Sequence, residues 1–152
     1  MTEPDNKTDQ TCDLAKQNCI PCSGSLPPAT AEEIQTLQTQ VPHWDLITEF
    51  AELRLQRAYH FLNFKEALAF TNSVGEIAEQ EGHHPVIVTE WGKVTVTWWT
   101  HAIGGLHEND FIMAAKCDRI LEHSSLRTKK LPGAKPAKYP LKSTWVNLSF
   151  VV

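Results

Sequence analysis

Three of the chain's seven histidines, His83, His84 and His101, fall within 19 residues, and acidic residues stand on both sides of them. Imidazole is the side chain that most easily gives and takes protons near neutral pH. Glu79 lies four positions before His83. A carboxylate beside an imidazole raises the imidazole pKa and fixes its tautomer, as general acid/base catalysis requires. With Asp110 on the other side, this grouping predicts proton-transfer chemistry.

Trp91 indicates what kind of ligand the histidines would act on. An aromatic plane can stack on a flat ring, so an indole near these imidazoles favours a flat, polar, ring-shaped ligand. Each assignment has a structural alternative. A corner histidine can cap helix carbonyls, Glu79 can be a solvated helix position, and Trp91 can be surface packing at a hairpin. Asp110 fits the N3 position of a capped helix, where acids are favoured regardless of function. The joint spacing, rather than any one residue, supports the hypothesis.

A metal site is the main alternative chemistry. Cys12, Cys19 and Cys22 have a spacing similar to that of a zinc knuckle, but tetrahedral structural zinc needs four ligands. The adjacent His83 and His84 do not form the i, i+4 pair that binds zinc from a helix. We therefore expect no metal at the histidines and free thiols at the cysteines. A cysteine site completed by a histidine stays as the weaker alternative.

Composition places the chain among single-domain globular proteins. Of its 152 residues, 41% are hydrophobic and 21% are charged, which is enough to bury a core. A net charge of −4 argues against a general nucleic-acid binder. The sequence lacks the run of ~20 apolar residues that a membrane span needs, and its start lacks the apolar centre of a signal peptide. We expect a cytoplasmic protein that binds neither membranes nor nucleic acids directly.

Uneven charge helps to divide the chain. From Ser124 onward there are six Lys or Arg and no Asp or Glu, so the preceding part carries about −10. Residues 1–29 are polar and end in Ser-Leu-Pro-Pro, which predicts a flexible, cysteine-containing leader. We expect one folded domain over residues 30–124 and a basic extension over residues 125–152. The extension could form an edge strand at 145–152 or contact a protein partner.

Capping residues and hydrophobic periodicity predict the elements that position these side chains. Thr30 and Glu33 form a capping box, while Asn63 starts and Gly82 ends a second helix. The order α-β-β-α-β-β-α indicates an α+β fold with a four-stranded antiparallel sheet and helices packed on one face. The expected elements are a short helix ending before residue 42, strands at 44–48 and 52–61, a helix at 64–81, strands at 85–91 and 93–101, and a helix at 106–121.

Alternation along the last expected strand predicts where its histidine points. Val94, Val96 and Trp98 would face the helices, so His101 would lie on the opposite, open face. The other two histidines lie at the corner between the second helix and the following strand. The fold therefore has to bring two different elements together to form one site.

The residues of this window keep fixed gaps: an acidic residue, three positions, His-His-Pro, an aromatic residue six further on, a second histidine and an aspartate at the next helix. This pattern resembles the signature of pterin-4a-carbinolamine dehydratases. The resemblance continues upstream and covers roughly residues 30–122. The residues that carry it are Glu79, His83-His84-Pro85, Trp91, Thr100-His101, Gly105-Leu106 and Asp110, preceded by Trp44, Phe61, Phe64 and Ala69-Phe70.

The resemblance implies a hydro-lyase that removes water from a 4a-hydroxytetrahydropterin to give a quinonoid dihydropterin. That reaction recycles the tetrahydropterin cofactor of aromatic amino-acid hydroxylases and needs neither a metal nor a redox cofactor. By analogy His83 and His101 would be the acid/base pair, His84 would hold and polarise the substrate, and Glu79 would orient an imidazole. Residues that would bind the substrate or support its pocket are Pro85, Trp91, Thr100 and Asp110.

Two features depart from the family pattern. His107 stands at the N-cap of the last helix, where relatives usually have Ser, and the chain beyond Ser125 lies outside the familiar domain. Family members also act as dimerisation partners of transcription factors, and dehydratase-like proteins without the histidines serve as assembly factors. A non-catalytic interaction or assembly factor is therefore the alternative function. The family's oligomers, and a sheet with an open face and free edges, predict a homodimer or homotetramer.

Overall fold

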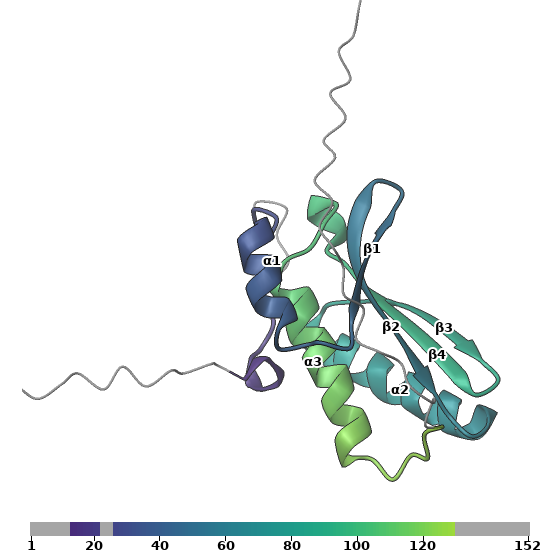
Figure 1. Ribbon diagram of the computed structural model, residues 1–152. Coiled ribbons are helices and arrows are strands. Elements are labelled where there is room, and N and C mark those ends of the chain that lie inside the picture. Colours follow the sequence, from purple (N-terminus) through teal and green to yellow (C-terminus); the bar gives the residue numbers. More distant parts are fainter. Residues whose placement is uncertain (1–12, 22–25, 130–152) are drawn as a thin grey trace, which may run out of the picture.

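The computed structural model describes residues 13–21 and 26–129, and Figure 1 shows their arrangement. Apart from two short 3-10 turns, the order of elements is the predicted α-β-β-α-β-β-α. The predicted fold class is therefore confirmed. The elements are η1 (Leu14–Lys16), α1 (Ala31–Gln38), β1 (Asp45–Glu49), β2 (Glu52–His60), α2 (Phe64–Glu81), β3 (Val86–Glu90), β4 (Lys93–Trp98), η2 (His101–Ile103) and α3 (Glu108–His123).

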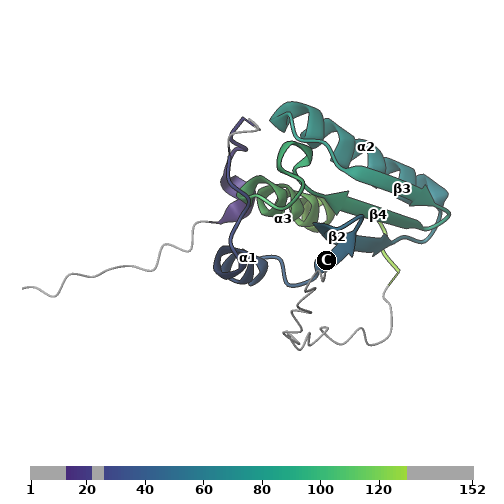
Figure 2. The same cartoon turned by 90° about the horizontal axis from the view of Figure 1, so that it is seen from above.

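The four strands form one antiparallel sheet in the order β1-β2-β4-β3. Two hairpins, β1–β2 and β3–β4, are joined where β2 pairs with β4, so that Leu55 lies opposite Trp98 and Tyr59 opposite Val94. Helices α2 and α3 pack against the sheet, as the view in Figure 2 shows. This order places β4, which leads into the candidate site, in the middle of the sheet and leaves β1 and β3 at its edges.

The predicted helix caps are confirmed by their hydrogen bonds, although α3 spans Glu108–His123 and not the predicted 106–121. Thr30 and Glu33 form the expected capping box of α1, and the Asn63 side chain accepts from the backbone N–H at position 66 to start α2. Gly82 then ends α2 in the left-handed conformation, with φ 63°. Such a φ suits glycine because it has no Cβ. His107 is the N-cap of α3, as predicted.

The core lies between the sheet and the two long helices. Val94, Val96 and Trp98 of β4 are fully buried, as predicted, but Thr97 and Trp99 on the expected open face are also buried, at 4% and 5% exposure. Phe70 of α2 and Phe111 of α3 are also fully buried. Burial of each such side chain stabilises the fold by about 1.5–3 kcal/mol. The end of β4 is therefore held in place by packing on both helices.

The predicted strand at 93–101 is too long, because β4 ends at Trp98. The backbone N–H of Thr100 bonds to the carbonyl of Gly105 at 2.8 Å, and η2 closes the loop between them. Gly104, with φ 59°, provides the left-handed residue that this reversal needs. His101 is exposed, as expected, but it lies on a turn rather than on the open face of a strand.

The expectation of a flexible leader is wrong for residues 13–21. Leu14 is only 2% exposed and joins the core, and Asp13 forms an ion pair with Arg119 of α3 at 2.7 Å. Leu14 thus joins this otherwise polar segment to the core. Residues 1–12 and 22–25 lie outside the described residues, and so do 130–152 with the predicted strand at 145–152.

Within residues 13–21 and 26–129, no helix combines the length and the apolar character that crossing a membrane would require.

Candidate active site

His83 is the buried histidine of the cluster. The left-handed turn at Gly82 directs the chain inward after α2, and the His83 side chain is 5% exposed. Its Nε2 lies 2.6 Å from Oδ1 of Asp110. The imidazole also stacks on the Trp98 indole, with ring centres 5.4 Å apart and planes 14° apart. Packing and a short hydrogen bond thus fix both the position and the orientation of this ring.

Asp110 is fully buried and bonds to three different segments. Besides His83, it accepts hydrogen bonds at Oδ2 from the Thr100 hydroxyl at 3.0 Å and from the His107 backbone N–H at 2.8 Å. The contact with the His107 N–H completes the capping box of α3. A carboxylate only accepts hydrogen bonds, so it holds the proton of His83 on Nε2.

Sequence reasoning attributed Asp110 chiefly to helix capping, and the structure shows that one carboxylate serves both purposes. One oxygen binds the imidazole, while the other caps the helix and binds Thr100. The signal that could have shown this is the sequence Thr100-His101 before a capped helix, because a buried hydroxyl needs an acceptor nearby.

Glu79 pairs with His84, not with His83 as its spacing had indicated. His84 Nε2 lies 2.8 Å from Glu79 Oε1, and both side chains are exposed, His84 to 59% and Glu79 to 79%. Glu79 lies on the solvent side of the last turn of α2, and the chain reverses at Gly82 before His83 turns inward. The expected carboxylate–imidazole contact therefore exists, but with the neighbouring histidine.

His101 reaches the same place from the other side. Its exposed ring lies against Trp99, with ring centres 4.2 Å apart, and the guanidinium of Arg54 lies 3.9 Å from the Trp99 ring centre. Arg54 is itself held by carboxylates of Glu49 and Glu52. The Trp99 ring that His101 contacts is thus also held by a fixed guanidinium group.

One hollow collects the three histidines. It has a volume of about 190 Å³ and is open to solvent. Small-molecule pockets usually measure ~300–1,000 Å³, so this hollow would enclose only part of a ligand. Its walls come from the corner after α2, as predicted, and from η2, where the sequence had predicted the end of a strand. The lining residues are Gly82, His83, His84, Thr100, His101 and Ala102.

Trp91 does not reach this hollow in its own chain. It lies at the tip of the β3–β4 hairpin and is 73% exposed. The five residues of β3 separate it from the histidine corner, a distance of about 17 Å along a strand. The predicted stacking role is therefore not supported by this geometry. Pro85, by contrast, directly follows His84 and leads the chain from the corner into β3.

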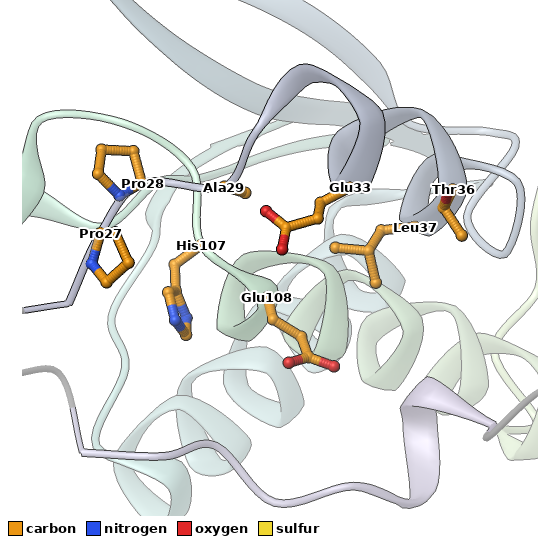
Figure 3. Close-up of a pocket in the computed structure, with 8 residues that line it drawn as sticks. All are labelled: Pro27, Pro28, Ala29, Glu33, Thr36, Leu37, His107 and Glu108. Carbon is orange, nitrogen blue, oxygen red and sulfur yellow. The ribbon is translucent and has the colours of Figure 1, made fainter.

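A larger cavity of about 360 Å³ lies between α1 and the start of α3 (Figure 3). It is lined by Pro27, Pro28, Glu33, His107 and Glu108 among others, and its polar groups already serve the helix ends. Glu33 accepts hydrogen bonds within the capping box of α1, and Nδ1 of His107 accepts one from the α3 backbone. Backbone hydrogen bonds lower the pKa of Glu33. We therefore interpret this cavity as a consequence of how the helix ends pack and not as a ligand site.

The arrangement at the smaller hollow can transfer protons. A buried imidazole with a fixed tautomer and two exposed imidazoles on neighbouring segments can address two atoms of one flat ligand. Among the residues that the structure describes, no three His, Cys, Asp or Glu side chains are grouped so as to hold a metal ion. Cys12 and Cys22 lie outside those residues.

Fold and site together describe a class: small α+β proteins whose histidines and carboxylates meet where a helix and a turn approach each other. Comparison with known proteins gives the family. The family model for pterin 4 alpha carbinolamine dehydratase matches residues 27–120. The chain therefore belongs to the pterin 4 alpha carbinolamine dehydratase family.

Individual relatives agree with this membership. A protein of Microcystis aeruginosa is 58% identical over 108 residues, which is 71% of this chain and 93% of the relative. One of Marinobacter nauticus is 56% identical over 107 residues, 70% of this chain and 96% of the relative. Both are provisionally named pterin-4-alpha-carbinolamine dehydratases. A Brucella melitensis crystal structure described as a transcriptional coactivator/pterin dehydratase superposes with a TM-score of 0.57 at 26% identity, covering 62% of this chain and 98% of that one.

Proposed function

We propose that this protein is a 4a-hydroxytetrahydropterin dehydratase that works by histidine acid/base catalysis. The observation that carries the proposal is the meeting of His83, His84 and His101 at one hollow, where a buried carboxylate fixes the first of them. Membership of the family supplies the substrate class.

The reaction needs two proton transfers at neighbouring atoms of a flat ring. A proton delivered to the 4a-hydroxyl lets the C4a–O bond break and water leave. Removal of the proton on N5 forms the N5–C4a double bond of the quinonoid dihydropterin. The hydroxyl and the N5 hydrogen together make one water, so no oxidant or reductant is required. Reduction of the product elsewhere would return the tetrahydropterin cofactor to use.

His83 and His101 divide these two transfers, because they face the hollow from different segments. His84 holds and polarises the substrate at the rim, and Glu79 orients the His84 ring through the 2.8 Å contact. Thr100 contributes through its hydrogen bond to the buried Asp110, and Pro85 shapes the corner. Trp91 lies too far from the hollow of its own chain to have a role in this scheme.

The edge strand β3 supports the oligomer that the sequence led us to expect. Val86 and Val88 on this strand are 44% and 48% exposed, and an unpaired edge with apolar side chains favours pairing with a second copy. We propose a homo-oligomer, and light scattering during size-exclusion chromatography measures its mass. A monomer at micromolar concentration would contradict this part of the proposal.

A second candidate function is that of a non-catalytic interaction factor. The description of the Brucella melitensis structure as both a coactivator and a dehydratase is the observation that favours it. In that case the histidines would not be needed for the interaction, and the protein would have no dehydratase activity for them to support. The two functions therefore make opposite predictions for the same variants.

The deciding experiment follows the decay of a freshly generated 4a-hydroxytetrahydropterin in the presence of His83→Ala, His101→Ala and a control. His123→Ala is the matched control, because it removes an exposed histidine at the far end of α3. General acid/base groups contribute ~10²–10⁴-fold, so we expect each site variant to lose at least about 100-fold of the rate. Full activity in both site variants would refute catalysis by these residues.

A further inference from the structure

The N-terminal strap, as we call residues 13–21, runs across the two helix ends that carry the candidate site. Its 3-10 turn η1 packs against α3 (Figure 1). Leu14 anchors one end of the strap in the core, helped by the ion pair between Asp13 and Arg119. The other end, at Cys19 and Ile20, approaches the histidine corner.

Hydrogen bonds connect Cys19 and Ile20 to both helix ends. The Cys19 backbone N–H donates to Oε2 of Glu81, the last residue of α2, at 2.8 Å. The Ile20 N–H donates to Oδ1 of Asn109 at 3.1 Å, and Nδ2 of Asn109 donates back to the Ile20 carbonyl at 2.7 Å. The Asn109 side chain is thus paired with the backbone N–H and C=O of a single strap residue, Ile20, through both its oxygen and its nitrogen. Because Asn109 is only 1% exposed, water could not replace these bonds without opening the structure.

Glu81 also joins the two helices directly. It accepts a hydrogen bond from Nζ of Lys116 in α3. Burial alone would raise the pKa of Glu81, but the hydrogen bonds from Lys116 and the Cys19 backbone hold that pKa below its usual value. The carboxylate is therefore charged at neutral pH and shared among α2, α3 and the strap.

The tethered residues are immediate neighbours of the buried acid/base pair. Asn109 directly precedes Asp110, and Glu81 lies two positions before His83. Helix ends open more readily than helix middles. The 2.6 Å contact between Asp110 and His83 joins two such ends, and a hydrogen bond weakens steeply when its atoms separate or tilt. Because the strap ties the end of α2 and the start of α3 to the neighbouring residues Cys19 and Ile20, it limits how far Asp110 and His83 can separate.

We propose that the N-terminal strap is a positioning element of the active site, and that Asn109 and Glu81 are positioning residues that hold Asp110 against His83. The kinetic consequence rests on the proposed dehydratase function. The geometric consequence concerns the His83 imidazole alone and can be measured without any pterin.

The test uses the full-length protein with Asn109→Ala. Misplacing a catalytic group by a fraction of an ångström to 1 Å can cost up to ~10²-fold in rate, so we expect kcat to fall by roughly tenfold or more with little change in KM. Without pterin, ¹⁵N-labelled protein should show a protected His83 Nε2–H resonance that broadens or disappears in Asn109→Ala. Loss of the resonance reports the Asp110 contact itself.

Three further variants separate positioning from general stabilisation. Asp13→Asn breaks the exposed ion pair at the distant end of the strap, and exposed ion pairs contribute little to stability, so kcat should stay within about twofold and the His83 resonance should be unchanged. Glu81→Gln keeps an oxygen that can accept from the Cys19 N–H, whereas Glu81→Ala does not. We expect Glu81→Gln to retain most of the rate and the His83 resonance, and Glu81→Ala to lose both.

A folded Asn109→Ala protein with wild-type kcat and an unchanged His83 resonance would overturn the proposal. Equal losses in Asp13→Asn and Asn109→Ala would overturn it too, because the strap would then only stabilise the fold. If Asn109→Ala does not fold, the Glu81→Ala and Glu81→Gln pair decides with the same readouts. If the wild-type protein has no dehydratase activity but its His83 resonance responds to Asn109→Ala, the proposed function fails while the positioning role stands.

Discussion

His83 and His84 are neighbours in the chain, and each forms a short contact with a carboxylate, yet their surroundings differ almost completely. The pair of His83 and Asp110 is 5% and 0% exposed, and the pair of His84 and Glu79 is 59% and 79% exposed. Hydrogen bonds are stronger electrostatically in the protein interior than in water, whereas exposed ion pairs contribute ~0–1 kcal/mol. The first pair can fix a tautomer, and the second can only bias an orientation.

The difference arises from the backbone turn at Gly82. After the left-handed Gly82, consecutive side chains point in opposite directions, so His83 enters the space beside Trp98 while His84 faces solvent. The side on which each histidine lies then decides which carboxylate it meets. The last turn of α2 offers Glu79 on the outside, and the first turn of α3 offers Asp110 on the inside.

The largest effect is expected for Asp110→Asn. The amide oxygen would accept from Thr100 and the His107 N–H, so the amide nitrogen would face His83 Nε2 and force that atom to become an acceptor. With the wrong tautomer, kcat should fall by about 100-fold or more. The measurement is the dehydratase assay, with Asp45→Asn on the exposed edge strand as control. Wild-type kcat in Asp110→Asn would show that the buried pair does not take part in catalysis.

Gly82→Ala tests the turn that separates the two histidines. No atom lies within 4 Å of the added methyl group, so the cost comes only from the left-handed backbone, and the free energy of unfolding should fall by about 1 kcal/mol. Urea unfolding measures this change. Gly75→Ala is the control, because it lies inside α2 with equally open surroundings and should leave stability unchanged or raise it by about 0.5–1 kcal/mol. Equal stability of the two variants would mean that the corner can adopt another conformation.

A smaller effect is expected when acid protonates the half-buried carboxylate of Glu81. Its pKa in the folded protein lies below the usual 4.5, so its stabilising contribution is complete above pH 4.5 and is lost as pH falls through the folded pKa. Between pH 4.5 and that folded pKa the wild-type protein should therefore lose more stability than Glu81→Gln, which has no such proton to bind. Urea unfolding at a series of pH values measures the two slopes. Glu76→Gln, on the exposed side of the same helix, should follow the wild-type slope, and parallel slopes for all three proteins would contradict the expectation.

The smallest effect is expected for Glu79→Gln. An exposed contact contributes ~0–1 kcal/mol, so weaker orientation of His84 should lower kcat by no more than about fivefold. The decrease should shrink further at high salt, because salt screens exposed charges. The dehydratase assay at low and high ionic strength measures both. A 100-fold loss would show that Glu79 acts on the substrate directly and would remove the contrast between the two pairs.

Local signals explain which parts of the fold could be predicted. The Thr30 capping box, the Asn63 cap and the Gly82 stop involve only residues a few positions apart, and all three were confirmed. The buried face of β4 follows from simple alternation. The end of that strand was missed because the bond between Thr100 and Gly105 depends on how the following loop closes.

The sequence predicted which residues belong to the candidate site better than it predicted the contacts that they make. The sequence indicated that His83, His84 and His101 belong together, and all three line the same hollow. Trp91 was placed with them by its spacing, but the length of β3 takes it to the other end of the hairpin. The strap was missed, because nothing in a polar segment reveals that its peptide groups will find Asn109 and Glu81 far along the chain.

By itself the sequence determined the order of elements, the helix ends, the family and the set of histidines, because these depend on short-range periodicity and on fixed spacing. Only the tertiary structure decided which carboxylate serves which histidine. Spacing favoured Glu79 for His83, since four positions on a helix bring two side chains together, but the helix ends at Gly82 before that geometry is reached. Packing of α3 against the end of α2 supplies Asp110 instead, from 27 residues further along the chain.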